Sequence, residues 1–195
     1  VSLTITEKGY CRDAAANTLA EDHPDVRHDL SGAAPRSALG FLVEALRRRR
    51  AAGAAPFTAL SCDNLPSNGE TLRRLLVRFA ALRDTDLGRW VEGEVACPST
   101  MVDRIVPATT DADRAEVDAM LGQHDACPVA AEPFLHLVIE DHFPSGRPDF
   151  ASAGAELVRD VAPFELMKLR LLNGSHSTLA YLGYLAGYQT IAETI

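Results

Sequence analysis

The chain has 195 residues, of which 47% are hydrophobic and 24% are charged, as in a globular protein of one domain or one domain plus part of another. Its net charge of −8 argues against broad binding to nucleic-acid phosphates, and no apolar run reaches the roughly 18 residues that a membrane span needs. Four cysteines without a CxxC pair, and no secretory signal pattern, favour a reduced, cytoplasmic compartment.

The first third of the chain predicts a strand, a helix and a second strand. Val1–Thr6 alternates apolar and polar residues, as a strand does. Glu7–Arg36 is polar and rich in turn residues, and we expect a long loop there, with room for a short helix. Ser37–Ala52 carries a helical apolar stripe and ends before Gly53, and Thr58–Cys62 is a short, mostly apolar strand. This order is a βαβ unit, which implies parallel strands and a right-handed crossover.

The basic run Arg47–Arg50 falls in the last turn of this expected helix. Cations suit that position because the last carbonyl groups carry the negative end of the helix dipole. We therefore interpret the run as a solvated helix end and not as a nucleic-acid patch.

Beyond residue 62 the pattern predicts a mixture of helices and strands that ends in helix. A helix from about Glu70 to Leu82 has Asn68 as its N-cap candidate. The further expected elements are strand pieces at 95–97 and 101–106, a helix at 113–121 and a strand at 134–139. From Asp149 onward the pattern is helical, with a new helix starting at Pro163.

Two polar positions follow or interrupt expected strands. Asp63 and Asn64 come directly after the second strand, and ligands bind at the carboxyl ends of strands in open α/β sheets. Asn64 could aim its amide at a ligand oxygen, or the pair could form only an Asx turn. Asp103 and Arg104 lie in an apolar strand, which indicates a structural ion pair or an edge strand; the alternative is that Asp103 lines the site.

Lys168, Asn173 and His176 lie within nine residues of one another in an otherwise apolar segment. On an α-helix they fall within about 140° of arc, so one helix could present a proton acceptor, an amide donor and an imidazole to one pocket. Glu165 lies three residues before Lys168, where its carboxylate would raise the proton affinity of the amine while burial would lower it. The alternative is that Lys168 is an ordinary lysine that extends to the surface.

A metal site could be assembled from the residues His124, Cys127, His136, Glu140 and His142. However, no structural-zinc spacing is matched, and on a strand His136 and Glu140 would be roughly 13 Å apart. We therefore expect no metal. The sequence also contains neither a G-x-S-x-G elbow nor a GxG dinucleotide fingerprint.

Several motifs taken together resemble the polyol-specific long-chain dehydrogenases, a family that includes mannitol 2-dehydrogenase and fructuronate reductase. They are the segments 61–69, 101–107 and 167–176, the last of which carries the family's catalytic pattern Lys-x4-Asn-x2-His. The resemblance runs through essentially the whole chain. One departure is Cys97, where the family usually has Phe before the Pro, at a packing position.

The resemblance implies an α/β fold: the later part of a Rossmann-like parallel sheet, followed by the start of an α-helical substrate domain. We expect the first domain, with an extension, at residues 1–155 and the second at 156–195. The family's glycine-rich phosphate loop, first strands and most of its helical domain have no counterpart here, so the chain resembles the middle of a longer protein.

The resemblance also implies roles for individual residues. Lys168 would be the general base, Asn64 and Asn173 would donate hydrogen bonds to the reacting oxygen, His176 would hold a neighbouring hydroxyl, and Asp103 would lie beside nicotinamide and substrate. The cofactor would be NAD or NADP, and the substrate a sugar alcohol or an aldonate. The alternatives are a non-catalytic fragment of such an enzyme, unable to bind cofactor alone, and a metal-binding module around 124–142.

Overall fold

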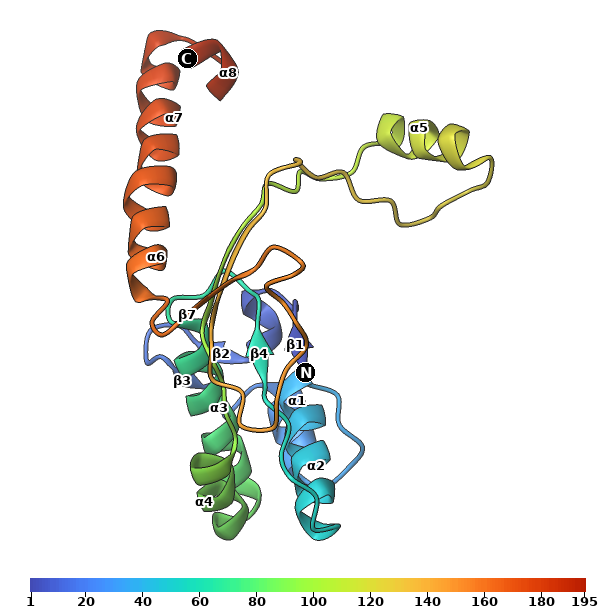
Figure 1. The fold of residues 1–195 in the computed structure, drawn as a ribbon, viewed down its shortest axis with the longest axis vertical. Helices are drawn as coiled ribbons and strands as arrows, with labels where there is room; N and C mark the ends of the chain where they lie inside the picture. Colours follow the sequence, from blue (N-terminus) through green and yellow to red (C-terminus); the bar gives the residue numbers. More distant parts are fainter.

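A parallel strand pair lies next to helices α2 (Ala38–Ala51) and α3 (Asn68–Arg83) in the computed structural model, which describes residues 1–195 (Figure 1). Strand β1 (Ser2–Leu3) pairs in parallel with β4 (Leu60–Ser61), and helix α2 lies between them in sequence. The predicted βαβ order and parallel pairing are confirmed. Both strands are shorter than expected, although the backbone bonds Leu60 N–H to Val1 O and Cys62 N–H to Leu3 O extend the pairing.

The polar stretch before α2 is more ordered than a long loop. It contains the 3-10 helix η1 (Glu7–Tyr10), an antiparallel hairpin of β2 (Arg12–Asp13) and β3 (Thr18–Leu19), and helix α1 (Pro24–Leu30). Side-chain carboxylates supply the order that apolar periodicity does not reveal. Asp13 accepts hydrogen bonds from two backbone N–H groups of the hairpin turn, and the buried Asp29 accepts two backbone N–H bonds and one hydroxyl at the start of α2.

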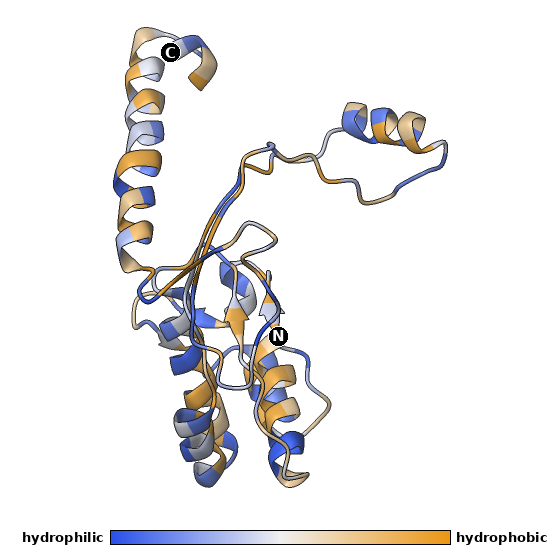
Figure 2. Cartoon of the chain, viewed as in Figure 1, coloured by the Kyte–Doolittle hydropathy of each residue, from blue (hydrophilic) through white to orange (hydrophobic).

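Helices α2 and α3 (Asn68–Arg83) enclose the main core together with α4 (Thr85–Glu94), a helix that the sequence pattern did not predict. Figure 2 shows the apolar side of these helices in orange. The α2 prediction is confirmed within one residue at each end. About half of the 19 core residues are apolar side chains of α2 and α3: Leu39, Leu42, Val43, Leu46, Leu72, Leu75, Leu76, Phe79 and Ala80.

Asn68 is not the N-cap of α3, contrary to expectation. Ser67 holds the cap position with a left-handed φ of 43° and makes no side-chain cap bond. Asn68 is buried, and its amide donates to Asp63 O and to both oxygens of Thr100, while its Oδ1 accepts from Thr100 N–H at 2.9 Å. The side chain therefore joins the β4–α3 loop to the next sheet instead of closing its own helix.

A second sheet follows, of strands β5 (Thr100–Asp103), β6 (His136–Glu140) and β7 (Glu156–Val158). Strand β6 runs antiparallel to β5 and parallel to β7. Strand β7 corrects the expectation of helix from Asp149 onward, and the residues predicted as a strand at 95–97 are irregular. The connection from β5 to β6 projects from the sheet as an arm (Figure 1). This arm carries helix α5 (Asp111–Leu121), which has no buried residue.

The chain ends in one long helical rod that projects from the sheets (Figure 1). It comprises α6 (Ala162–Met167), a π-helical segment η2 (Lys168–Asn173) and α7 (Gly174–Ala186), and the short helix α8 (Ile191–Thr194) folds back against it. Mixed α/β structure followed by a helical region confirms the predicted fold class. None of the helices is both long and apolar enough to cross a membrane.

Candidate active site

Lys168 lies where the helical rod meets both sheets. Its Nζ donates to the carbonyl oxygen of Val102 at 2.5 Å and to Oδ1 of Asn64 at 3.4 Å. Val102 belongs to β5, and Asn64 lies in the loop that follows β4. The side chain is half-buried and is directed inward, so it is not a lysine that extends freely to the surface.

The π-helical segment η2 determines how Lys168 and Asn173 stand relative to each other. Residues five apart on an α-helix differ by about 140° in direction, whereas a π-helix closes a turn with i to i+5 bonds, which bring such residues onto one side. One such bond is Gly174 N–H to Leu169 O. Lys168 and Asn173 accordingly line the same cavity. Sequence periodicity assumed an α-helix and gave no sign of this geometry.

The first cavity has a volume of about 260 Å³ and lies at the carboxyl end of β4. Its polar lining comes from the η1 helix, the β4–α3 loop, strand β5 and the rod: Glu7, Asp63, Asn64, Thr100, Glu165, Lys168 and Asn173. Four of the six predicted site residues, namely Asn64, Glu165, Lys168 and Asn173, are thus brought together here from positions about a hundred residues apart, at the edge where α/β sheets bind ligands.

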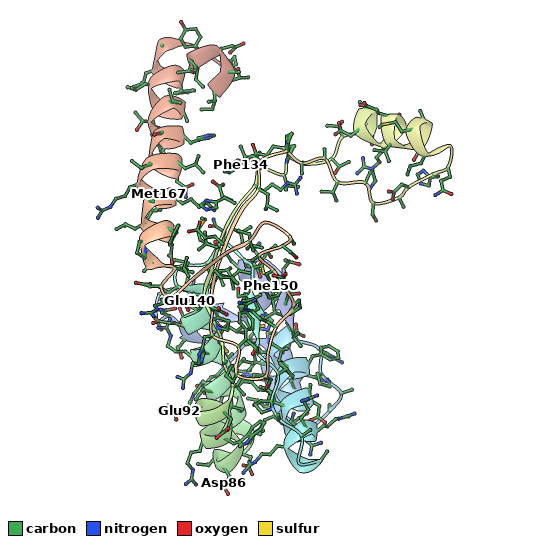
Figure 3. All side chains as sticks on the ribbon, viewed as in Figure 1. Asp86, Glu92, Phe134, Glu140, Phe150 and Met167 are labelled. Atoms are coloured by element: carbon green, nitrogen blue, oxygen red, sulfur yellow. The ribbon has the colours of Figure 1, made fainter.

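The second cavity, of about 460 Å³, opens on the other side of Lys168. It contains the remaining two predicted residues, Asp103 and His176, together with His136. Figure 3 labels two of its walls, Phe134 near the end of the strand pair and Met167 on the rod. Lys168 therefore separates a polar cavity from a more apolar one, and it is reachable from both.

His136 is a cavity residue that sequence reasoning considered only as a metal ligand. It pairs with Asp103 across the β5–β6 ladder, and its ring meets Phe134 and Phe164 edge to face. Its Nε2 lies 3.4 Å from Glu156 on β7. The register of β6 against β5 brings His136 to the site, and no sequence motif predicts that register.

Glu165 lines the first cavity with Lys168, but its carboxylate is directed elsewhere. Both of its oxygens accept from the backbone N–H of Ser67 at 3.2 Å, so the contact joins the rod to the β4–α3 loop. Asp103 likewise does not pair with its neighbour, because Arg104 donates to the carbonyl oxygen of Glu132 on the arm. The structural ion pair is therefore wrong, whereas the other alternative, an edge strand, agrees with the place of β5 at the edge of its sheet.

Two groups around Asp63, the residue before Asn64, have a raised pKa. Burial raises the pKa of the Cys62 thiol, and the Asp63 carboxylate raises it further. Burial also raises the pKa of the Tyr10 phenol, and although its hydrogen bond with Ser61 lowers that pKa, its hydrogen bond to Asp63 raises it again. Both side chains thus remain protonated near neutral pH, and Cys62 is not a thiolate nucleophile.

The residues assembled as a possible metal site do not converge. His124 bonds to Asp118 at the tip of the arm, whereas His136 lies in the second cavity. No three His, Cys, Asp or Glu side chains of the chain are placed to hold a metal ion together. The geometry therefore gives no support to a metal-binding module around 124–142.

The basic end of α2 is also accounted for structurally. Arg47 and Arg48 both bond to Glu44 from the same helix, and Arg83 of α3 reaches the same carboxylate at 3.1 Å. A cavity of about 450 Å³ lies among Arg47, Arg50 and Arg83. Arg50 stands over the ring of Trp90, so the guanidinium groups around this cavity already have partners.

Two family models cover nearly all of the chain. The model of the mannitol dehydrogenase Rossmann domain matches residues 1–152, and the model of the mannitol dehydrogenase C-terminal domain matches residues 160–195.

Individual relatives agree with this assignment. The chain is 54% identical to D-mannonate oxidoreductase of Escherichia coli (strain K12) and 46% identical to mannitol 2-dehydrogenase of Aspergillus terreus, in each case over 100% of this chain and 40% of the relative. The crystal structure of D-sorbitol dehydrogenase in substrate-free form matches 97% of the chain and 39% of its own length, with a TM-score of 0.91 and 39% identity. The Pseudomonas fluorescens mannitol 2-dehydrogenase ternary complex with NAD and D-mannitol matches 100% of the chain and 40% of its own length, with a TM-score of 0.86 and 47% identity. The chain spans about 40% of the length of these relatives, and it belongs to the mannitol dehydrogenase family.

Proposed function

We propose that the whole protein oxidises a sugar alcohol or an aldonate reversibly to the corresponding ketose or keturonate, with NAD or NADP as the hydride carrier. The observation that carries the proposal is the position of Lys168. Its amine is held between Asn64 and the end of β5, at the ligand-binding edge of the parallel strands, with Asn173 in the same cavity. The substrates named for the relatives, mannonate and mannitol, set the two substrate classes.

The side chains divide the chemistry of an alcohol–ketone interconversion among them. Lys168 takes the proton of the reacting hydroxyl in oxidation and returns it in reduction. Because Oδ1 of Asn64 already faces the amine, its Nδ2 is left to donate to the reacting oxygen. Asn173 donates to the same oxygen, and each such donor is worth on the order of 3 kcal/mol in the transition state. These groups supply the charge stabilisation, so the scheme needs no metal.

The second cavity holds the rest of the substrate in this scheme. His176 binds a hydroxyl next to the reacting carbon, and Asp103 lies beside the nicotinamide and the substrate. Glu165 lies in the first cavity with Lys168, where its carboxylate accepts from Ser67 N–H. A bound nicotinamide would accept hydride from the reacting carbon or supply it.

The donor set fits the nicotinamide end of such a cofactor. The first cavity opens at the carboxyl end of β4 and presents amide and amine groups there. Residues 1–155 would be the later part of the nucleotide-binding domain, and residues 156–195 the beginning of the helical substrate domain. The glycine loop that holds the cofactor phosphates has no counterpart in the sequence, so the second candidate is that the 195-residue chain alone does not bind cofactor.

Activity of the whole protein tests the first candidate. We expect NAD- or NADP-linked turnover of D-mannitol or D-mannonate, and a loss of kcat of at least about 100-fold on Lys168→Ala, because proton transfer by a positioned side chain contributes roughly that much. Lys8→Ala is the matched control, since Lys8 is the chain's other lysine and is exposed. Near-normal kcat of Lys168→Ala would refute the assigned base.

Titration of NADH into the purified 195-residue chain tests the second candidate. We expect no saturable change in nicotinamide fluorescence up to millimolar NADH. Saturable binding at micromolar NADH would show that the chain binds cofactor without a glycine loop, and the second candidate would be wrong.

A further inference from the structure

Asn64 is exposed, yet both of its neighbours in the chain are fixed. On one side Leu65 is buried in the main core. On the other side Asp63 is held through its side chain and its carbonyl group alike. The direction in which Asn64 presents its amide is therefore set by how firmly Asp63 is held.

The carboxylate of Asp63 reaches across to the segment that follows β1. Its Oδ2 accepts from Ile5 N–H at 3.0 Å and from the Tyr10 hydroxyl at 2.7 Å, and its Oδ1 accepts from Thr6 N–H at 2.9 Å. An ionised carboxylate with three donors is a strong hydrogen-bond acceptor. An Asx turn would have directed this side chain to its own loop. Here it bonds instead to Thr6 and Ile5, which lie 57 and 58 residues earlier in the sequence.

Tyr10 lies behind this carboxylate, and none of its surface is exposed to solvent. It has one hydroxyl proton, which goes to Asp63, so the Ser61 hydroxyl donates to the Tyr10 oxygen at 2.6 Å. The raised pKa of Tyr10 keeps that proton in place. The chain of bonds therefore has one direction, from Ser61 through Tyr10 to Asp63.

The carbonyl oxygen of Asp63 is held independently. It accepts from the amide of Asn68 at 3.1 Å and from Leu65 N–H at 2.8 Å. The same Asn68 amide bonds to Thr100 at the start of β5, the strand that supplies Val102 O to Lys168. The loop that carries Asn64 and the strand end that receives Lys168 are thus fixed through shared side chains.

We propose that Asp63 and Tyr10 are positioning residues of the reaction, which act through Asn64 by fixing the direction of its amide toward the reacting oxygen. The role rests on the proposed function, because Asn64 is assigned its donor role there. Neither side chain touches the reacting atoms in this scheme. Their removal leaves the groups that bind the rest of the substrate in place, so the loss falls on kcat more than on KM.

A double-mutant cycle in the whole protein tests the proposal. Tyr10→Phe removes one bond to Asp63 and keeps the ring, and Asp63→Asn removes the charge. We expect each to lower kcat about 10- to 100-fold, because small misplacements of reacting groups cost that much, with KM changed less than about threefold. In an Asn64→Ala background the same two substitutions should change kcat less than about twofold, because the residue through which they act is gone.

The control and the contrary results separate positioning from simple damage. Asp86→Asn removes an exposed carboxylate at the far end of the helices, labelled in Figure 3, and should leave kcat unchanged. The positioning role would be overturned if the substitutions lowered kcat equally in the wild-type and Asn64→Ala backgrounds, or if Tyr10→Phe kept full activity. Neither result would affect the proposed function, because the wild type would still turn over its substrate. Absence of wild-type turnover with every polyol and aldonate would refute the proposed function itself. Should Asp63→Asn fail to fold, Tyr10→Phe alone decides the cycle.

Discussion

Gly69 lies in the first turn of α3 against the backbone that leads into β5, and Gly69→Ala should destabilise the chain. A Cβ at this position would lie 2.5 Å from Cys97 O and 2.6 Å from Pro98 C and Ser99 N. All three are backbone atoms, so no side chain can rotate away. The segment 97–99 would have to move by about 1 Å to restore ordinary contact, and overpacking of this kind costs about 1–3 kcal/mol.

That movement also weakens bonds that hold the second sheet. Ser99 N–H donates to Glu140 at 2.8 Å, Glu140 N–H donates to Ser99 O at 3.0 Å, and Thr100 N–H donates to Asn68 at 2.9 Å. Loosening two or three such bonds adds about 1–2 kcal/mol, whereas the gain in helix propensity from Gly to Ala returns about 1 kcal/mol. The expected net loss is about 1–4 kcal/mol.

Urea unfolding followed by circular dichroism measures this loss directly. Gly93→Ala is the matched control, because Gly93 is also helical and a Cβ there meets nothing within 4 Å. We expect that control to be neutral or more stable by up to about 1 kcal/mol. A Gly69→Ala midpoint equal to that of the wild type at unchanged slope would refute the reasoning, since it would show that the backbone near Cys97 yields without cost.

Two further predictions concern stability and reactivity. Hydrogen bonds from Arg47 and Arg48, together with the charges of Arg47 and Arg83, lower the pKa of Glu44 from 4.5 to about 2. Its stabilising effect is therefore complete above pH 4.5 and is lost as the pH falls toward 2. Glu44→Gln should thus be less stable than the wild type by about 1 kcal/mol at pH 7 and equally stable near pH 2 in urea titrations, and a pH-independent difference would contradict this. Burial raises the pKa of Cys97 to about 12, whereas Cys127 is exposed, so a thiol reagent at pH 8 should label Cys127 within minutes and Cys97 only on unfolding; mass spectrometry of the labelled peptides decides.

Apolar periodicity predicted the helices that form the main core, and polar bonding explains most of what it missed. Helices α2 and α3 were found because their buried stripes repeat at helical spacing. The β2–β3 hairpin is held by the Asp13 carboxylate, and β7 is a three-residue strand whose place depends on its pairing with β6. Neither leaves a periodic trace. Asn68 suited an N-cap by residue type, but its partners across the fold determine its actual place.

The candidate site, too, could be predicted only in part from the sequence. The resemblance to a family brought Asn64, Asp103 and the Lys168 motif together, and the structure places them around two neighbouring cavities. Spacing alone left Lys168 open between a reactive and a surface position. The bond between Tyr10 and Asp63 was missed because it joins segments more than 50 residues apart, and such pairs have no signature in a single sequence.

The π-helical segment η2 contains one residue more per turn than the α-helices before and after it. Were the same six residues α-helical, each would turn roughly 20° further, and everything downstream would be rotated by about 100° about the helix axis. Exposed side chains of α7 such as Tyr184 and Leu185 would then face another direction. The six residues that bring Lys168 and Asn173 onto one side therefore also set the direction in which the side chains of α7 point. In engineered chimeras, substrate domains from relatives should be joined after Asn173 and never within this segment.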